Sequence, residues 1–330
     1  RGPGVARPAA RPPAPGRCVI GVGAYRPERL VTNDEIVGPI DSSDEWIQER
    51  SGIKTRRFAR PDETMLDMAE AAAREAIANS GIDPSLIDGV LVGSVTHHLF
   101  TPAAAPMLAD RLGLDKPAAI DIAAACAGYC FGIGLASDMI RSGDASHVLV
   151  IGAEKLTDVL DLTDRGSAFI FGDGAGAAVV GPSDHVGIGP TIWGSDGSGW
   201  ESIRQVGEGH QADPKITMAG QSVFRWAVWS MAPVALQAVE AAGLTPDDID
   251  VFIPHQANTR IIDAMVKQMK LPEHVKVARD IVDMANTSAA SVPLAAERMI
   301  REGQAKSGDI ALQIGFGAGL AYAAQVIEIP

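Results

Sequence analysis

The chain has 330 residues, of which 46% are hydrophobic and 21% charged, so it holds enough apolar material for one large or two smaller globular units. Its formal net charge of -13 excludes a protein-wide nucleic-acid surface but leaves room for a local basic patch that meets an acidic partner. With only three cysteines, we expect no disulfide framework and a reducing, cytoplasmic environment.

The first residues form no recognisable element. Residues 1–17 are rich in Pro, Ala and Arg, contain no acidic residue and show no secretory signal, so we expect a flexible tail over 1–18. The apolar stretch 122–136 is too short to span a membrane and contains three glycines, which favours a buried core helix. We therefore expect no membrane association.

Two pairs of segments repeat at nearly the same separation along the chain. Residues 74–92 and 236–253 each predict a helix, a glycine (Gly81 or Gly243), a proline turn and a β-branched strand. Residues 139–152 and 299–315 each predict a helix end, a Gly-Asp turn and a buried strand ending at Gly152 or Gly315. The repetition predicts two homologous α/β halves, 19–181 and 182–330, with sheets covered on both faces.

Cys126 lies in the segment AAIDIAAACAGYCFGIG, residues 118–134, which predicts a strand, a short loop and a buried helix beginning at the cysteine. The free N–H groups and dipole of a helix start favour a thiolate and lower the pKa of a thiol. Taken alone, the segment fits a buried structural role for Cys126 equally well. We assign such a structural role to Cys130, four positions further on. Cys18, near the chain end, is given no role.

Two further polar residues precede predicted helices. His255 follows a strand ending at Ile253 and precedes a helix, a setting that suits catalysis, although a structural loop histidine also fits. Asn286 occupies nearly the place in the second half that Cys126 has in the first, and fits either a helix N-cap or an amide donor to a substrate carbonyl. Pseudo-twofold packing would bring Asn286 and Cys126 together, between the halves.

The segment IGFGAGL, residues 314–320, is a glycine-rich turn after a strand. It lacks the Lys-Ser/Thr of a phosphate-binding P-loop and the GxGxxG dinucleotide pattern. An oxyanion hole formed by the backbone N–H groups of Cys126 and Ala318 fits better.

Taken together, these motifs resemble the β-ketoacyl-acyl carrier protein synthase III family, initiating condensing enzymes of the thiolase fold. The resemblance extends from Val19 to the C-terminus and is carried by SSDEWIQERSGI, DIAAACAG, LTDRGSAFIFGDGAGAAVV, VFIPHQANTRI, NTSAASVP and GFGAGL. It implies a thiolase-like α/β fold of two duplicated halves in a layered α-β-α-β-α sandwich. The N-terminal half would carry the nucleophile and the C-terminal half His255 and Asn286, in a homodimer.

The resemblance also implies a reaction. Cys126 would take an acyl group from acyl-CoA, and His255 with Asn286 would stabilise the enolate formed when malonyl-acyl carrier protein loses carbon dioxide. The product, a 3-oxoacyl-acyl carrier protein, would begin fatty-acid biosynthesis by ping-pong kinetics, with no metal and no cofactor beyond the coenzyme A of the substrate.

Other positions acquire implied roles from the same resemblance. The expected coenzyme A contacts are Trp46, Arg50, Arg165, Gly220, Gln221, Phe224 and Ala227. Carrier-protein docking is expected at Arg225, Arg260 and Lys267, and an acyl pocket at Thr101, Leu156 and Phe316. Three positions depart from the usual family pattern: Ala285 replaces a glycine, Gln221 an asparagine and Thr101 a bulky phenylalanine. A small Thr101 predicts tolerance of branched or longer starters as well as acetyl.

Alternatives differ in their sequence requirements. Thiolases use a second cysteine near the C-terminus, but no cysteine follows Cys130 here. Elongating synthases use a second histidine where this chain has Asn286, and the HQAN and GDGAGA contexts favour the type III family over chalcone-type synthases. A papain-like protease shares the order Cys, His, Asn but not the local cysteine context. A non-catalytic ketosynthase partner would usually lack Cys126. A polyketide starter synthase or acyltransferase with the same residues stays open.

Overall fold

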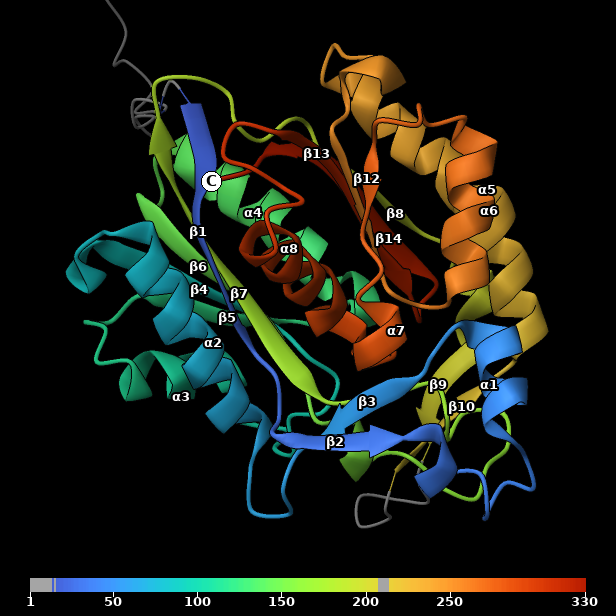
Figure 1. Ribbon diagram of the computed structural model, residues 1–330. Helices are drawn as coiled ribbons and strands as arrows, with labels where there is room; N and C mark the ends of the chain where they lie inside the picture. Colours follow the sequence, from blue (N-terminus) through green and yellow to red (C-terminus); the bar gives the residue numbers. More distant parts are fainter. Residues whose placement is uncertain (1–13, 15, 207–213) are drawn as a thin grey trace, which may run out of the picture.

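Two five-stranded sheets form the frame of the computed structural model, which describes residues 14, 16–206 and 214–330 (Figure 1). Sheet I has the order β1 (Gly16–Tyr25), β7 (Gly174–Ser183), β6 (His147–Glu154), β4 (Ile87–Gly93) and β5 (Ala118–Ile122). Sheet II has the order β8 (Ile192–Ser195), β14 (Ala321–Glu328), β13 (Ile310–Gly317), β11 (Val251–Pro254) and β12 (Lys276–Val277).

The two sheets have the same topology, which confirms the predicted duplication. In each, the last three strands of the order given run parallel, while the other two pairings are antiparallel. The repeated glycines also match, because Gly81 and Gly243 both follow a helix with a positive φ, 69° and 74°. Such a left-handed conformation favours glycine at a helix end.

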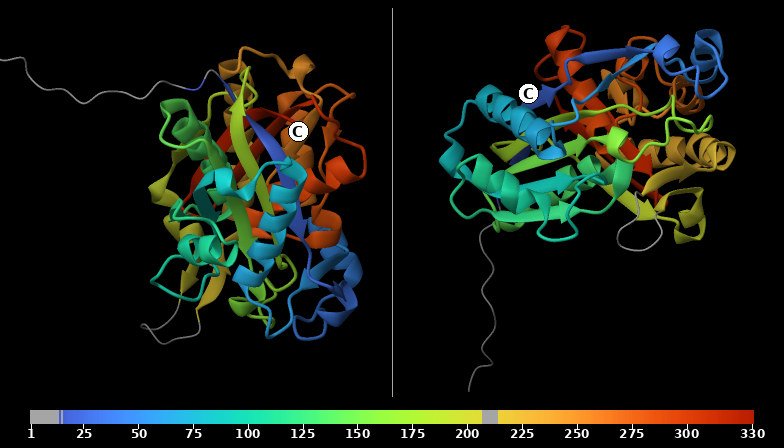
Figure 2. Two further views of the ribbon diagram at one scale, coloured as in Figure 1. Left: turned by 90° about the vertical axis from the view of Figure 1, so that its left-hand side faces the viewer. Right: turned by 90° about the horizontal axis from the view of Figure 1, so that it is seen from below.

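Helices fill three layers around the sheets, giving the predicted α-β-α-β-α order (Figures 1 and 2). The outer face of sheet I is covered by α2 (Met65–Ser80) and α3 (Ala104–Arg111), and that of sheet II by α5 (Gly220–Ala241) and α6 (Thr259–Met269). Between the sheets lie α4 (Gly128–Ser142) and α8 (Ser291–Arg301). The apolar sequence of α4 follows from this central position, since both of its sides meet protein.

Shorter elements lie beside one end of the sandwich. They are α1 (Asp44–Ser51), β2 (Arg29–Thr32), β3 (Thr55–Phe58), β9 (Ile203–Val206), β10 (Lys215–Met218) and α7 (Ile281–Met284). Three single turns of 3-10 helix matter for the site: η3 (Ala125–Ala127), η4 (Leu156–Asp158) and η8 (Ser288–Ala290).

The chain enters the fold earlier than the sequence predicts. β1 begins at Gly16 and pairs with β7, so residues 16–18 belong to a strand rather than to the expected tail 1–18. Backbone pairing needs no particular side chain, which explains why the boundary is not visible in the sequence. Residues 1–13 and 15 of that predicted tail lie outside the described part of the chain. Among the described helices, none combines the length and the apolar character needed to cross a membrane.

Candidate active site

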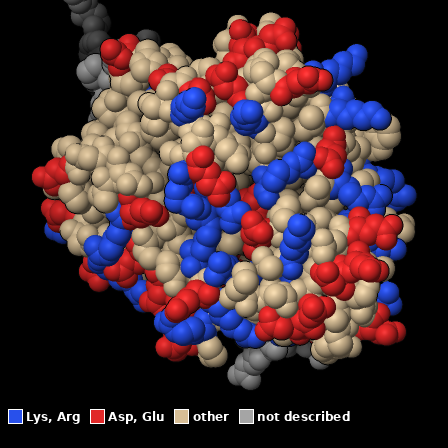
Figure 3. Space-filling view, viewed as in Figure 1, with Lys and Arg blue, Asp and Glu red and all other residues tan. Residues whose placement is uncertain are grey.

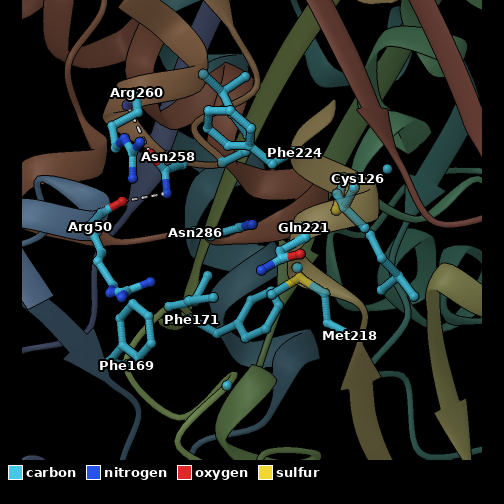
Figure 4. A pocket seen from close by; sticks show the side chains of 18 of the residues that line it. Arg50, Cys126, Phe169, Phe171, Met218, Gln221, Phe224, Asn258, Arg260 and Asn286 are labelled. Carbon is cyan, nitrogen blue, oxygen red and sulfur yellow. Dashed lines mark hydrogen bonds between the residues drawn. The ribbon is translucent and has the colours of Figure 1, made fainter. Parts of the chain in front are cut away.

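A cavity of about 800 Å³ lies between α1, the β9–β10 hairpin and the outer helices of sheet II. Its lining includes Cys126, His255 and Asn286, which come from both halves of the chain. Figure 4 shows the side chains of Cys126 and Asn286 directed to the interior. The three residues singled out from the sequence therefore share one pocket.

Cys126 stands in η3, the single turn between β5 and α4, close to where the sequence predicts a helix start. The preceding Ala125 has a φ of 46°, a left-handed conformation that is uncommon outside glycine and turns the chain sharply. The backbone N–H groups of Cys126 and Ala318 lie near the Cys126 thiol and act to lower its pKa. An anion formed at this point would meet the same two donors.

The acidity of this thiol differs from the prediction. Burial raises the pKa of Cys126 to about 11, and the negative charge of Glu154 adds to the rise, while the nearby Ser288 hydroxyl and the backbone N–H groups of Cys126 and Ala318 oppose it. The expected lowering by the helix start is therefore outweighed by removal from water. At neutral pH the thiol is protonated, so its reaction as a nucleophile requires a proton acceptor.

His255 lies just beyond β11 and is buried, with 1% of its surface exposed. Burial lowers the pKa of the imidazole to about 3, so the ring is neutral at physiological pH. Its Nδ1 lies 2.6 Å from Ser291 Oγ, which also accepts the N–H of Gln256. A hydroxyl that accepts from Gln256 can donate its proton to Nδ1, and this tautomer leaves a proton on Nε2 for a ligand.

Asn286 is fixed by its backbone and by its amide oxygen. Its N–H donates to Ile170 O at 2.8 Å, and its Oδ1 accepts the N–H of Ser288, also at 2.8 Å. These contacts assign the amide orientation and leave the Nδ2 donors for the cavity. His255 and Asn286 thus offer two uncharged N–H donors, a set that can stabilise an enolate without supplying an acidic proton to quench it.

The Asn286 loop is strained on both sides. Ala285 has φ 57° and ψ −161°, a region that is essentially reserved for glycine, and Ser288 has a φ of 52°. This explains why a glycine is usual at position 285 in the resembled family: the backbone, not the side chain, needs it. Tight packing around the loop holds the alanine in this conformation, since Ala285 is only 1% exposed.

The cavity entrance carries aromatic and cationic side chains. The guanidinium carbons of Arg50 and Arg165 lie 4.6 Å and 4.9 Å from the centre of the Trp46 ring, and Phe169 meets the ring edge-on at 5.2 Å. Asn258 joins this side to α6, because its Nδ2 donates to Arg50 O at 2.9 Å (Figure 4). A flat aromatic group with attached phosphates would find stacking surfaces and positive charge here.

Helices α5 and α6 supply the opposite wall. Gly220, Gln221, Phe224 and Arg225 line the cavity from α5, and Arg260 from α6 lies over the Phe224 ring at 5.4 Å. Lys267 is exposed further along α6 and does not line the cavity. Figure 3 shows Lys and Arg side chains gathered on the right-hand side of the molecule, over these two helices, with acidic side chains among them.

Three of the positions expected to contact substrate do not line this cavity. Thr101 is exposed on the surface loop before α3, outside the cavity of the single chain. Leu156 and Ala227 are buried behind the cavity wall, Leu156 in a cluster with Phe171 and Ala227 in the core under α5. Phe316 does line the cavity, and its ring meets that of His255 edge-on at 5.2 Å.

Several lining residues were not singled out from the sequence. They include Phe171, Ile203, Met218, Val223 and Ile261, which are apolar residues in ordinary core patterns. The buried carboxyl of Glu154 and the hydroxyl of Ser288 beside Cys126 were missed as well. Residues 288 and 286 share one short motif, and that proximity was the available signal for Ser288.

The chain matches known families along most of its length. The family described as 3-oxoacyl-[acyl-carrier-protein (ACP)] synthase III matches residues 120–197, and its C-terminal region matches residues 239–329. The β-ketoacyl-acyl carrier protein synthase III 1 of Streptomyces coelicolor is 56% identical, with 96% of this chain and 97% of the relative covered. A mycobacterial β-ketoacyl-acyl carrier protein synthase III, from Mycobacterium marinum, is 52% identical over 94% and 95%.

Solved structures of similar proteins share the fold of this chain. The priming β-ketosynthase of the R1128 polyketide biosynthetic pathway superposes with a TM-score of 0.94 at 48% identity, over 99% of both chains. The 3-oxoacyl-acyl carrier protein synthase III of Pseudomonas aeruginosa gives 0.89 at 33% identity, over 96% of this chain and 98% of the other. This chain therefore belongs to the β-ketoacyl-acyl carrier protein synthase III family.

Proposed function

We propose that this protein condenses an acyl-CoA starter with malonyl-acyl carrier protein, releasing carbon dioxide and giving a 3-oxoacyl-acyl carrier protein that begins fatty-acid biosynthesis. One observation carries the proposal: a thiol that meets two backbone N–H donors shares a cavity with the neutral donors His255 and Asn286. It is further supported by relatives at 50–56% identity, which are β-ketoacyl-acyl carrier protein synthases III.

In the first half-reaction, Cys126 Sγ attacks the thioester carbonyl of acyl-CoA. The developing oxyanion is stabilised by the N–H groups of Cys126 and Ala318, which already converge on this sulfur. Coenzyme A leaves and the acyl group stays on Cys126 as a thioester, so the first product departs before the second substrate binds.

In the second half-reaction, malonyl-acyl carrier protein enters and loses carbon dioxide. His255 Nε2–H and Asn286 Nδ2–H donate to its thioester carbonyl, and the resulting enolate attacks the acyl carbon on Cys126. Both donors are uncharged, which suits a carbanion that must not be protonated early. The chain's own residues supply each of these steps, so we propose that neither a metal nor an additional cofactor takes part.

Coenzyme A recognition is proposed at the cavity entrance. Its adenine would stack at Trp46, with Arg165 displaced from its present position 4.9 Å above the ring, and Arg50 would meet the phosphates. Gly220, Gln221 and Phe224 would flank the pantetheine arm.

Malonyl-acyl carrier protein would dock by its acidic surface on Arg225, Arg260 and Lys267. Two of these side chains line the cavity mouth and the third extends the same charge along α6, so the negative net charge of the chain does not prevent local attraction. We place the reaction in the cytoplasm, in keeping with three unpaired cysteines.

We propose that a homodimer forms along the free edge of sheet I, where β5 lies. β5 is an edge strand, and its Ile120 is 53% exposed, while Phe131 and Trp193 stack at 5.6 Å beside a hollow of about 320 Å³. Unprotected edges and exposed apolar side chains of this kind favour pairing with a second copy. Since Thr101 lies outside the cavity of its own chain, it would reach an acyl pocket only across such an interface.

The experiment that tests the proposed function is intact-protein mass spectrometry with several acyl-CoAs, followed by product analysis after malonyl-acyl carrier protein is added. The wild-type protein should gain one acyl group and transfer it to a 3-oxoacyl product. Cys126→Ala should gain none, and an acyl adduct on that variant would defeat the assignment.

The same experiment weighs a second candidate, the starter ketosynthase of a polyketide pathway. It is favoured by the 48% identity to the priming β-ketosynthase of the R1128 pathway. Condensation with the carrier protein of a polyketide pathway, and not with that of fatty-acid synthesis, would favour this alternative.

A further inference from the structure

Glu154 carries a buried carboxyl group beside the candidate nucleophile Cys126. This carboxyl has no role in the two half-reactions proposed above. It ends β6 and has 0% of its surface exposed. Its Oε2 accepts hydrogen bonds from Ser94 Oγ, Val95 N and Thr96 Oγ1 at 3.1, 3.0 and 2.8 Å. No described Lys, Arg or His side chain forms an ion pair with it, and its Oε1 has no hydrogen bond from the described residues.

Ser288 lies between this carboxyl and Cys126. Its turn η8 packs against both η3, which carries Cys126, and β6, which ends in Glu154, and its side chain lowers the pKa of both groups, although its Oγ forms no hydrogen bond with a described residue. The left-handed φ of 52° at Ser288 and the bond from its N–H to Asn286 Oδ1 hold it in place. An incomplete buried hydrogen bond is costly, so a strained residue that keeps one points to a function.

Other ionisable groups at this end of sheet I have their own partners. Lys155 Nζ donates to the carbonyls of Arg60 and Pro61 and lies 3.5 Å from Asp158. Asp173, next to the β7 residue that pairs with Glu154, accepts from Thr157 and from the N–H of Ala59. The turn η8 and the end of β4 bring no charged side chain to Glu154, so of the described titratable groups it is Cys126, in η3, that faces it.

We propose that Glu154 receives the proton of Cys126 through the Ser288 hydroxyl when the thiol is acylated. The Sγ proton passes to Ser288 Oγ as the hydroxyl proton moves to Glu154 Oε1. The sulfur then bonds to the acyl carbon and the carbon–sulfur bond to coenzyme A breaks. The departing sulfur takes up the proton held by Glu154, returned through Ser288, so that Glu154 is ionised again and the step balances. Glu154 acts through Ser288 and is a positioning residue in this sense; the inference rests on the proposed function.

Acidity favours Glu154 over the neighbouring imidazole as acceptor. Burial raises the pKa of Glu154 to about 7, and hydrogen bonds from Val95, Thr96 and Ser94, with the nearby Ser288 hydroxyl, limit the rise, so a large fraction is ionised near neutral pH. The pKa of the thiol is about 11, and that of His255 about 3. Transfer to Glu154 is therefore much less uphill than transfer to His255, which keeps the imidazole neutral for its role as donor.

Single-turnover acylation by acetyl-CoA, followed by rapid quench and intact mass across pH 5 to 9, tests the relay. In the wild type the rate should rise with an apparent pKa near 7, the value of Glu154. Glu154→Gln should lose this rise and react about 100-fold more slowly at pH 8, Ser288→Ala should behave alike, and Glu154→Asp should recover part of the rise. Asp173→Asn is the matched buried-carboxylate control and should keep the wild-type profile.

Thr96→Val supplies a readout that a purely structural role would not move. Its hydroxyl stabilises the ionised carboxyl, so its removal should raise the pKa of Glu154 and shift the rate profile to higher pH. If Glu154→Gln is acylated at a rate within about twofold of the wild-type rate, with an unchanged pH profile, the relay is overturned. If that variant does not fold, an unmoved profile in Thr96→Val overturns it equally. A wild-type protein that takes no acetyl group would instead contradict the proposed function.

Discussion

Gly152 of β6 and Gly315 of β13 occupy equivalent places, and each makes room for a loop of the opposite half. A Cβ at Gly152 would collide with the carbonyl oxygen of Ala289, in the loop that follows Asn286. A Cβ at Gly315 would lie 3.0 Å from Ala127 Cα, directly after Cys126. The duplication is therefore reciprocal: each central strand accepts the loop that carries the other half's polar residue.

Gly152→Ala tests this contact. The added methyl group must displace backbone that is already buried, which should lower the free energy of unfolding by about 1–3 kcal/mol and reduce condensation more than acylation, because the Asn286 loop moves. Thermal unfolding and single-turnover assays measure both effects. Gly38→Ala, where nothing lies within 4 Å of the new Cβ, is the control. Equal stability of the two variants would contradict the reciprocal packing.

His255→Ala separates the two half-reactions. The imidazole is neutral and offers a donor to the second substrate, so the variant should still take an acetyl group on Cys126 but lose condensation by about 100-fold or more. Intact mass measures the first step, and carbon dioxide release from malonyl-acyl carrier protein the second. Ser291→Ala removes the hydroxyl that contacts His255 Nδ1, so this variant should show a weaker form of the same condensation defect. Gln256 is buried beside His255 and donates to Pro254 O, and a folded Gln256→Glu protein is the control. Normal condensation by His255→Ala would refute the role.

The sequence predicts the repeated architecture and the shared pocket because both are written in local patterns. Strand periodicity, helix-ending glycines and the contexts of Cys126, His255 and Asn286 each need only a few neighbouring residues. The duplication then places residues from distant segments at one interface.

What the sequence does not predict depends on burial by the other half. The helix start at Cys126 indicates a low pKa, but packing raises it to about 11. Glu154 looks like a polar residue at a strand end, and it becomes a buried carboxyl only because the strand end of β4 and the turn η8 cover it. The exposed position of Thr101 likewise depends on the path of a surface loop, which no short motif encodes.

Ala285→Gly should stabilise the protein. At φ 57° and ψ −161° an alanine is strained by about 1–3 kcal/mol, whereas the extra freedom of glycine in the unfolded chain costs about 0.4–1 kcal/mol. The net expectation is a gain of about 1 kcal/mol in the free energy of unfolding. Chemical denaturation measures it, and Ala289→Gly, in the same loop but without a positive φ, should destabilise. A loss of stability in Ala285→Gly would show that the loop is not strained there.

Lys267→Glu should weaken carrier-protein recognition alone. The side chain is exposed on α6 outside the cavity, so acylation by acetyl-CoA should be unchanged while the KM for malonyl-acyl carrier protein rises about tenfold at low salt, an effect that added salt should diminish. Lys306→Glu carries the same charge change at the opposite end of β13 from the cavity residue Gly317 and should leave both values unaltered. An equal effect of the two variants would indicate a general response to net charge.

Thr101→Phe tests both the starter range and the proposed subunit interface. If Thr101 of one chain lines the acyl pocket of a second copy, the wild type should accept branched and longer acyl-CoAs. The bulky ring of Thr101→Phe should lower the rate of acylation by these starters about tenfold or more, while acylation by acetyl-CoA is kept. Competition between acetyl-CoA and isobutyryl-CoA, read by intact mass, measures the change. Ile120→Arg, placed on the exposed edge of β5, should separate the subunits in light scattering and abolish the effect of residue 101 on starter choice. A wild-type protein that is active with acetyl-CoA alone, or a monomer whose starter range still follows residue 101, would contradict the prediction.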